Sequence, residues 1–196
     1  MPIRVLLFPC VLGVLAVEEP VKCDRNIRNM TQDDELLKKL LSRAGAILAR
    51  RAHSRGEIRV KLAKFADPDD VERTLDRLEA VNLLNDADYA YNFASSRIRQ
   101  QGWGPLKVRQ SLLRRHVAPL VTEEALDRLR QEIGDDVILG DYLKRFCQKS
   151  GLPRDRKGIQ RLINHLRRRG FVDETIYGAL RRAVPEAAWE NFETGE

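Results

Sequence analysis

The residues best suited to chemistry with a partner lie in one basic stretch, Ser96 to Val117, with the sequence SRIRQQGWGPLKVRQSLLRRHV. This stretch holds six Lys or Arg side chains, one Trp and no acidic residue. Such a pattern favours contact with phosphate groups, because each phosphate that a cation neutralises adds a salt-dependent contribution to affinity. The alternative is a solvated helix face, the usual role of a charge run. The candidate contact residues are Arg97, Arg99, Lys107, Arg109, Arg114 and Arg115.

Trp103 and an arginine triplet are further candidates, each with a structural alternative. Trp103 lies between two glycines, where it can stack on a base or insert into a partner, or else plug a junction between helices. Arg167, Arg168 and Arg169 precede Gly170 at a predicted helix end. They can contact the same partner, or complement the helix dipole at that end. Both alternatives are open for the Trp and for the triplet.

The sequence lacks the patterns that are typical of catalytic or metal sites. Cys10, Cys23 and Cys147 fit neither a C-x-x-C pair nor a disulfide framework, which implies a reducing compartment. The three histidines are scattered, with no Cys or carboxylate at ligand spacing. No Ser/His/Asp order and no Gly-rich phosphate loop occurs. We therefore predict a protein that is not an enzyme and needs no metal and no cofactor.

Composition indicates a folded, helical and basic protein. The 196 residues are 43% apolar and 33% charged, which argues against disorder, and aromatic residues make up only 6%. Unbranched residues such as Leu, Ala and Arg lose little rotamer freedom in a helix, so their abundance favours an all-α fold. The net charge of +6 suits nucleic acid, an anionic membrane or a nucleoprotein as partner. The alternative is a basic protein without such a partner.

Apolar residues at helical spacing, with caps between them, predict the elements that position these side chains. Leucines recur at three and four residues between Asp33 and His53. Ser54 and Glu57 then form a capping box, which accounts for Glu57 without a catalytic role. The next helix should direct Ile58, Leu62 and Phe65 inward. Asp67-Pro68 opens a third helix, Asn85-Asp86 a fourth, and Gly-Trp-Gly-Pro breaks the fourth from a fifth.

This pattern of three helices in about fifty residues occurs three times. In the second copy Thr122 should cap the third helix, and the third copy should begin at Gly140. Helical repeats of this period predict an all-α, elongated and curved array of three tandem three-helix repeats, with about nine helices. The predicted parts are an N-terminal extension at 1–29, repeats at 30–85, 86–138 and 139–184, and an acidic tail at 185–196.

The N-terminal extension has three alternative interpretations. Residues 1–17 hold an apolar run behind Arg4 that is too short to span a bilayer as a helix. We expect residues 1–29 to be disordered or wrongly assigned, with Met30 as the true start. A signal peptide with a small-residue cleavage site and a folded segment are the alternatives.

Four segments of the chain resemble the RecX family of bacterial recombinase modulators: RGEIRVKL, LDRLEAVNLLNDADYAYNF, RQQGWGPLKVRQSL and RRRGFVDETI. The resemblance runs from about Ile47 to Ala183. Its most specific part is L-L-N-D-A-D-Y-A followed by G-W-G-P.

The resemblance implies a cytoplasmic regulatory protein that is not an enzyme. It implies binding in the groove of a RecA filament on single-stranded DNA, with inhibition of the recombinase and regulation of DNA repair, recombination and the SOS response. We expect a monomer with no small-molecule substrate and no membrane partner. The alternative function is a direct helical DNA-binding module without a recombinase partner. An exported basic protein is a third option that rests only on residues 1–17.

Overall fold

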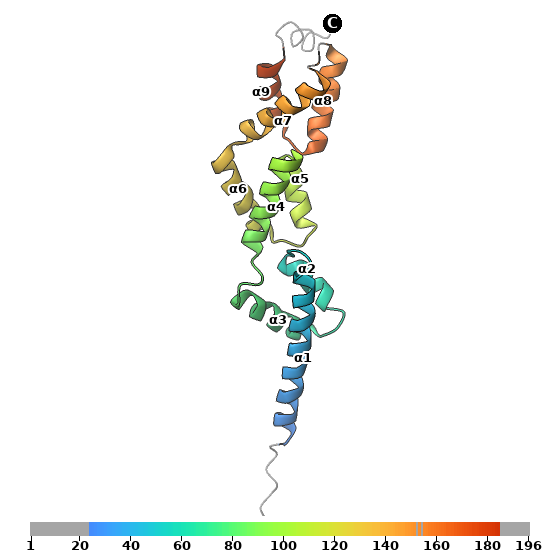
Figure 1. Cartoon of the computed structure of the whole chain (residues 1–196), viewed down its shortest axis with the longest axis vertical. Coiled ribbons are helices and arrows are strands. Elements are labelled where there is room, and N and C mark those ends of the chain that lie inside the picture. The colour runs from blue at the N-terminus through green and yellow to red at the C-terminus, as the bar shows by residue number, and fades with distance from the viewer. Residues whose placement is uncertain (1–23, 152, 154, 185–196) are drawn as a thin grey trace, which may run out of the picture. The chain divides into compact units, whose positions relative to one another are not determined.

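The computed structural model describes residues 24–151, 153 and 155–184, and all regular secondary structure in these residues is helical (Figure 1). The predicted all-α class and the number of helices are therefore confirmed. The helices are α1 Asp24–Leu48, α2 Arg55–Leu62, α3 Pro68–Ala80, α4 Asp86–Gln101, α5 Pro105–Leu113, α6 Pro119–Ile133, α7 Asp135–Ser150, α8 Arg156–Arg169 and α9 Asp173–Ala183.

The chain divides into two compact units between Leu36 and Leu37. Of the first unit, the described residues are those of α1 before the division, so this helix begins within the predicted extension. Residues 1–23 and the predicted acidic tail at 185–196 lie outside the described residues. The interpretations of residues 1–17 therefore stay predictions.

The first repeat buries one apolar stripe from each of its three helices. Leu40 and Ala44 of α1 are buried, and so are the inward residues of α2 and α3. The buried hydrophobic residues of α2 and α3 are Ile58, Leu62, Val71, Leu75 and Leu78.

The inward placement of Phe65 was wrong. The α2 helix ends at Leu62, so Phe65 follows in a turn and is not on the helical stripe. The Phe65 side chain is 53% exposed, and the Arg43 guanidinium lies 4.1 Å from its ring centroid.

The second and third repeats share one apolar core. Within the second, α4 packs against α5 and α6, and within the third, α9 packs against α7 and α8. The largest fully buried side chains of this core are Leu112, Leu129, Leu139, Ile159, Ile163, Leu166, Ile176 and Leu180. A continuous core holds these two repeats together, because burial of apolar surface is the main favourable term in folding.

Two helix starts differ from the prediction. The α6 helix begins at Pro119, so Thr122 lies inside it, buried, and its hydroxyl has no hydrogen-bond partner among the described residues. A Pro in the first turn starts this helix, since its missing N–H would be unsatisfied there in any case. The α7 helix begins at Asp135, directly after Gly134, so the predicted repeat boundary at 138/139 falls inside a helix.

The middle helices of consecutive repeats meet end to end. At the start of α2, the Ser54 hydroxyl donates to the carbonyl of Arg115, which follows α5. At the start of α5, the Gly104 N–H donates to the Arg169 carbonyl over 2.7 Å. The C-terminal carbonyls of one middle helix thus accept from the N-terminal end of the preceding one, which satisfies groups that a helix end leaves unpaired.

Candidate nucleic-acid interface

Five side chains of the second repeat alternate between cation and aromatic ring, and we call them the cation–aromatic row. The row consists of Arg115, Phe93, Arg97, Trp103 and Lys107. The Arg115 and Arg97 guanidinium carbons lie 4.8 and 5.0 Å from the Phe93 ring centroid. Arg97 also lies 5.2 Å from the Trp103 ring, and the Lys107 ammonium lies 4.6 Å from that ring. These distances are within the range of cation–π attraction.

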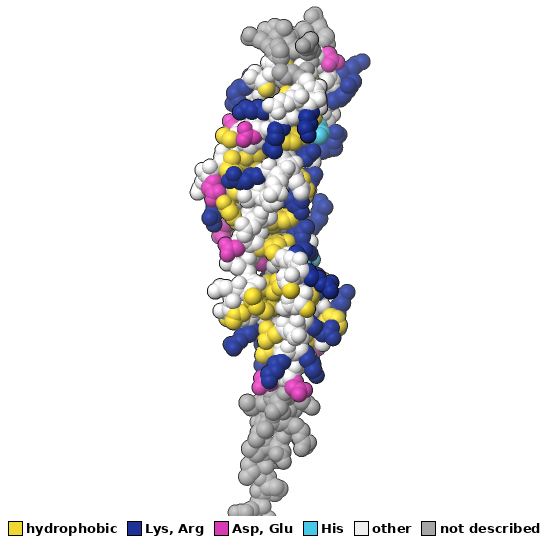
Figure 2. All heavy atoms as spheres, viewed as in Figure 1, with side chains coloured by type: hydrophobic (Ala, Val, Ile, Leu, Met, Phe, Trp, Pro, Cys, Tyr) yellow, Lys and Arg dark blue, Asp and Glu magenta, His cyan; other side chains and the backbone are white. Residues whose placement is uncertain are grey.

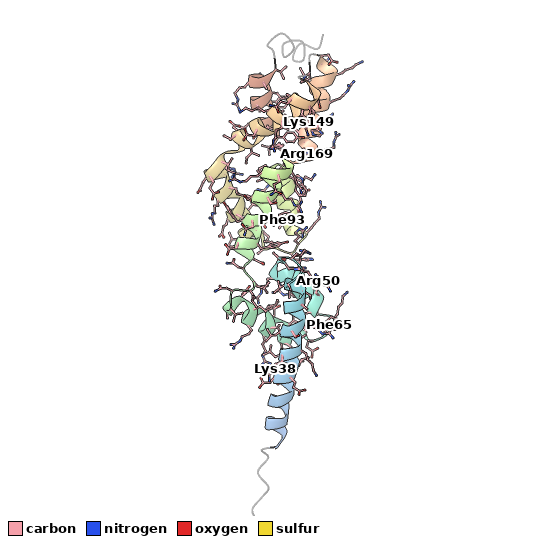
Figure 3. The ribbon with its side chains drawn as sticks, in the orientation of Figure 1. Lys38, Arg50, Phe65, Phe93, Lys149 and Arg169 are labelled. Carbon is pink, nitrogen blue, oxygen red and sulfur yellow. The ribbon has the colours of Figure 1, made fainter. Side chains whose placement is uncertain are left out.

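Helical spacing and one glycine break build this row. Phe93 and Arg97 are four residues apart on α4, so they lie on the same face (Figure 3 labels Phe93). The α4 helix ends at Gln101 and is followed by Gly102, whose φ of 62° is the left-handed conformation that glycine adopts without a steric penalty. Trp103 follows in the break, and α5 then starts at Pro105 and carries Lys107. Because of this break, α4 and α5 both contribute side chains to the cation–aromatic row.

Trp103 has the junction role that was one of its two predicted alternatives. Its side chain is half-buried and packs against the shared core of the second and third repeats. Its ring meets Phe93 edge to face, with centroids 6.4 Å apart. Stacking on a base stays a prediction.

Arg115 has internal partners from both the first and the second repeat. Its guanidinium lies 3.3 Å from the Glu57 carboxylate and 3.3 Å from the Tyr89 hydroxyl. Arg51 forms a second ion pair with Glu57, at 3.1 Å. The predicted capping box is present, since Ser54 and Glu57 bond reciprocally. Burial by itself raises the pKa of the Glu57 carboxyl, but hydrogen bonds from Arg51 and the Ser54 N–H outweigh it and hold the pKa below its ordinary value.

Arg109 is bound within the second repeat. Its guanidinium donates two hydrogen bonds to Glu123 of α6, over 2.5 and 2.6 Å. These bonds lower the pKa of the Glu123 carboxyl. A bidentate pair of this kind fixes the guanidinium in the plane of the carboxylate. Contact between Arg109 and a phosphate stays a prediction, and such contact would have to compete with Glu123 for the guanidinium.

The other two cations of the basic stretch are exposed. The Arg99 Nε donates to the Ser95 hydroxyl over 3.2 Å. Arg114 follows α5, and its side chain has no carboxylate partner among the described residues. Of these two, Arg114 is thus the cation that a partner could bind without displacing an internal contact.

The arginine triplet divides into three different environments. Arg167 pairs with Asp173 of α9 over 2.7 and 3.0 Å. Arg169 donates to the Gln101 carbonyl over 2.6 Å. Arg168 is exposed, with no hydrogen bond or ion pair to the described residues. The capping alternative is supported as well, because all three lie in the last turn of α8.

Charge within the second unit is distributed unevenly. Figure 2 shows Lys and Arg side chains gathered over the edge formed by α5 and α8, with Asp and Glu more frequent over α6. Beside the row, a pocket of about 590 Å³ is lined by Arg51, Tyr89, Phe93, Arg97 and Arg115, among others.

This surface includes three residues that the sequence patterns did not predict, Arg51, Tyr89 and Phe93. Both aromatic residues pack against the core while lining the pocket. The i, i+4 spacing of Phe93 and Arg97 was the available signal.

No helix in the described ranges is long and apolar enough to cross a membrane. Nor do His, Cys, Asp and Glu side chains in that part of the chain form a group that could hold a metal ion.

Comparison with known proteins identifies related chains along most of this sequence. Residues 36–78 match the family model described as RecX, first three-helix domain, and residues 85–126 match RecX, second three-helix domain. Regulatory protein RecX of Prosthecochloris aestuarii is 37% identical over 144 residues, which are 73% of this chain and 92% of that protein. Regulatory protein RecX of Thermus thermophilus is also 37% identical, over 74% of this chain and 93% of that protein.

The fold is similar to that of solved RecX structures. The crystal structure of RecX from Lactobacillus salivarius superposes with a TM-score of 0.67 at 17% sequence identity, covering 76% of this chain and 97% of that one. A second crystal structure of a regulatory protein RecX superposes with a TM-score of 0.65 at 21% sequence identity, covering 81% of this chain and 78% of that one. The similarity in sequence, which covers nearly the full length of the relatives, shows that this chain belongs to the RecX family of regulatory proteins.

Proposed function

We propose that this protein modulates the RecA recombinase, as an inhibitor, by binding in the groove of the RecA filament on single-stranded DNA. The observation that carries the proposal is the cation–aromatic row on α4 and α5. Membership of a family of regulatory proteins supports it.

The row has the chemistry that single-stranded nucleic acid requires. Aromatic rings accept bases of any sequence, and cations beside them neutralise the phosphates. Arg97 and Lys107 have no carboxylate partner among the described residues, so they are available to an external anion. The same half-buried cations suit an acidic protein surface, which is why a nucleoprotein filament fits better than DNA alone.

The proposal includes three further properties. The protein acts in the cytoplasm, where RecA filaments form, and it acts as a monomer. It has no catalytic activity of its own and regulates by occupying the filament. Recombination, DNA repair and the SOS response change as a consequence.

Hydrolysis of ATP by RecA on single-stranded DNA tests the function. We expect a dose-dependent decrease when the protein is present at far fewer copies than RecA. The double variant Arg97→Gln with Lys107→Gln should inhibit less, whereas Lys38→Gln, an exposed cation of α1 outside the row, should inhibit as the unchanged protein does. Inhibition that appears only when the protein covers the DNA, and that excess DNA abolishes, would instead favour a direct DNA-binding module.

A further inference from the structure

A second group of cations and rings surrounds a pocket of about 330 Å³ where the end of α4 meets α7 and α8. Its aromatic wall consists of Tyr142, Phe146 and His165, and its cations are Arg145, Lys149 and Arg169 (Figure 3 labels Lys149 and Arg169). No Asp or Glu of the described residues lines it. The volume is within the range of about 300–1,000 Å³ that small-ligand sites occupy.

The aromatic wall is held in place by its own contacts. The Phe146 and His165 ring centroids are 5.4 Å apart, and Tyr142 stacks on Phe146 at 6.3 Å. The Tyr142 hydroxyl and the His165 Nε2 are hydrogen-bonded over 2.6 Å. Tyr142 also packs on Gly102, where a Cβ would overlap its ring. The three side chains therefore present fixed planar faces to the pocket.

Two of the three cations are oriented by the last turn of α4. Arg145 donates to the Arg99 carbonyl over 3.3 Å, and Arg169 donates to the Gln101 carbonyl over 2.6 Å. Each guanidinium has five N–H groups, so each keeps donors for a ligand. Lys149 is exposed at the rim and has no ion pair with the described residues. Three cations without a carboxylate, two of them pre-oriented, favour a phosphate over a neutral ligand.

We propose that this pocket binds a nucleoside phosphate, with the phosphate against Arg145, Lys149 and Arg169 and the base against the aromatic wall. Such a ligand has two sources, one nucleotide of a single strand or a free nucleotide. The strand source deepens the function proposed above and rests on it, whereas the free-nucleotide source does not.

Nuclear magnetic resonance of the His165 ring protons tests the site in the full chain. The probes are inorganic phosphate, thymidine monophosphate and a single-stranded thymidine tetranucleotide. We expect a saturable shift with at least one of the two nucleotides, and a much weaker response to phosphate alone. A shift with the monophosphate assigns a free-nucleotide site, and a shift with only the tetranucleotide assigns a strand site. An equal response to inorganic phosphate, or no saturable shift, overturns the proposal.

Variants on α7 separate the pocket from the general charge of that helix. Lys149→Gln should weaken nucleotide binding about tenfold, the equivalent of 1.4 kcal/mol. Lys144→Gln is the matched control, because Lys144 is exposed on the same helix and does not line this pocket. Phe146→Leu should weaken binding of nucleotides while leaving the affinity for inorganic phosphate unchanged. Circular dichroism and thermal melting establish that each variant folds.

The outcomes also distinguish this site from the cation–aromatic row. Arg97→Gln should reduce the effect on RecA without changing the His165 response to thymidine monophosphate. If Lys149→Gln binds both nucleotides as the unchanged protein does, the pocket proposal fails while the proposed function stands.

Discussion

Individual cations of the basic stretch differ in what already binds them. Arg109 is held by Glu123, and Arg115 by Glu57. Arg97 and Lys107 lie on aromatic rings, and Arg114 extends without a carboxylate partner in the described part of the chain. A run of like charges in the sequence thus contains side chains with structural roles and side chains that a partner can bind.

The Arg109 pair should contribute to stability. Arg109→Glu places two carboxylates together. An exposed ion pair contributes about 0.2–1 kcal/mol to stability, and we expect this substitution to lower the free energy of unfolding by more than that. Arg114→Glu should change it by less than about 0.5 kcal/mol. The double change Arg109→Glu with Glu123→Arg should recover part of the loss. Urea unfolding followed by circular dichroism measures all three, and equal losses for the two single variants would contradict a structural role for Arg109.

Trp103 should contribute to both stability and binding. A fully buried Trp costs about 3–5 kcal/mol when changed to Ala, and Trp103 is half-buried, so we expect a loss of about 2 kcal/mol. Trp103→Phe keeps a ring beside Arg97 and Lys107 and should restore most of the stability. Thermal melting and single-strand binding are both measured. If Trp103→Ala lowers affinity but leaves the melting temperature unchanged, the junction role is wrong.

At the scale of elements, contact between backbones decides how α5 meets α8. A Cβ on Gly104 would overlap the backbone of Gly170, although the Gly104 φ of −82° itself suits any residue. Gly104→Ala should therefore destabilise the protein through sterics alone. Gly140→Ala is the control, since nothing lies within 4 Å of a Cβ there and Ala stabilises a helix interior by about 1 kcal/mol. Denaturant midpoints should move in opposite directions, and a Gly104→Ala variant as stable as the unchanged protein would show that the two backbones can separate freely.

The α2 and α3 helices are joined by a carboxylate whose pKa predicts acid sensitivity. Hydrogen bonds from Arg59 and then Arg55 lower the pKa of Glu72 to about 2 from its ordinary value of 4.5. Because the folded pKa lies below the unfolded one, this contribution to stability is complete above about pH 4.5 and is lost as the pH falls toward 2.

Unfolding measured from pH 7 to pH 2 tests this contribution. Glu72→Gln should be less stable at pH 7 and should lose less stability on acidification. Glu124→Gln removes an exposed carboxylate with no partner in the described residues, so its stability should change with pH as that of the unchanged protein does. Parallel curves for the unchanged protein and Glu72→Gln would contradict the assignment.

Sequence patterns predicted helix starts correctly where the capping interaction joins residues that are close in the sequence. Ser54 with Glu57, and Asn85 before α4, are caps in the sequence and in the structure. Thr122 failed because a hydroxyl before two acids resembles a cap, while Pro119 had already started the helix.

The candidate site was only partly predictable. Clustering of cations is visible in the sequence, but the partner of Arg109 lies on another helix, at a distance that no local pattern encodes. The pocket between α4, α7 and α8 depends in the same way on packing between repeats.

For the molecule as a whole, the net charge of +6 is less informative than the distribution of cations that have no carboxylate partner within the described ranges. Affinity for a polyanion responds to the phosphates that cations neutralise, with a slope of log affinity against log salt of about 0.7 per contact on single strands. A cation held by an internal carboxylate releases fewer counterions on binding. Paired and unpaired cations should therefore differ in how much they contribute to that slope.

Two sets of substitutions test this difference. Changing Arg97, Lys107 and Arg114 to Gln should lower the salt slope for single-stranded DNA by about 2, which is about 0.7 for each lost contact, and should leave the helical content unchanged. Changing Arg109 and Arg167 to Gln removes cations that are bound to Glu123 and Asp173, so stability should fall while the slope stays close to that of the unchanged protein. Fluorescence anisotropy of a labelled oligonucleotide over a range of salt concentrations measures both slopes. If the paired set reduces the slope per removed cation as much as the unpaired set does, internal ion pairs do not decide which cations contact DNA, and the whole basic edge acts as one surface.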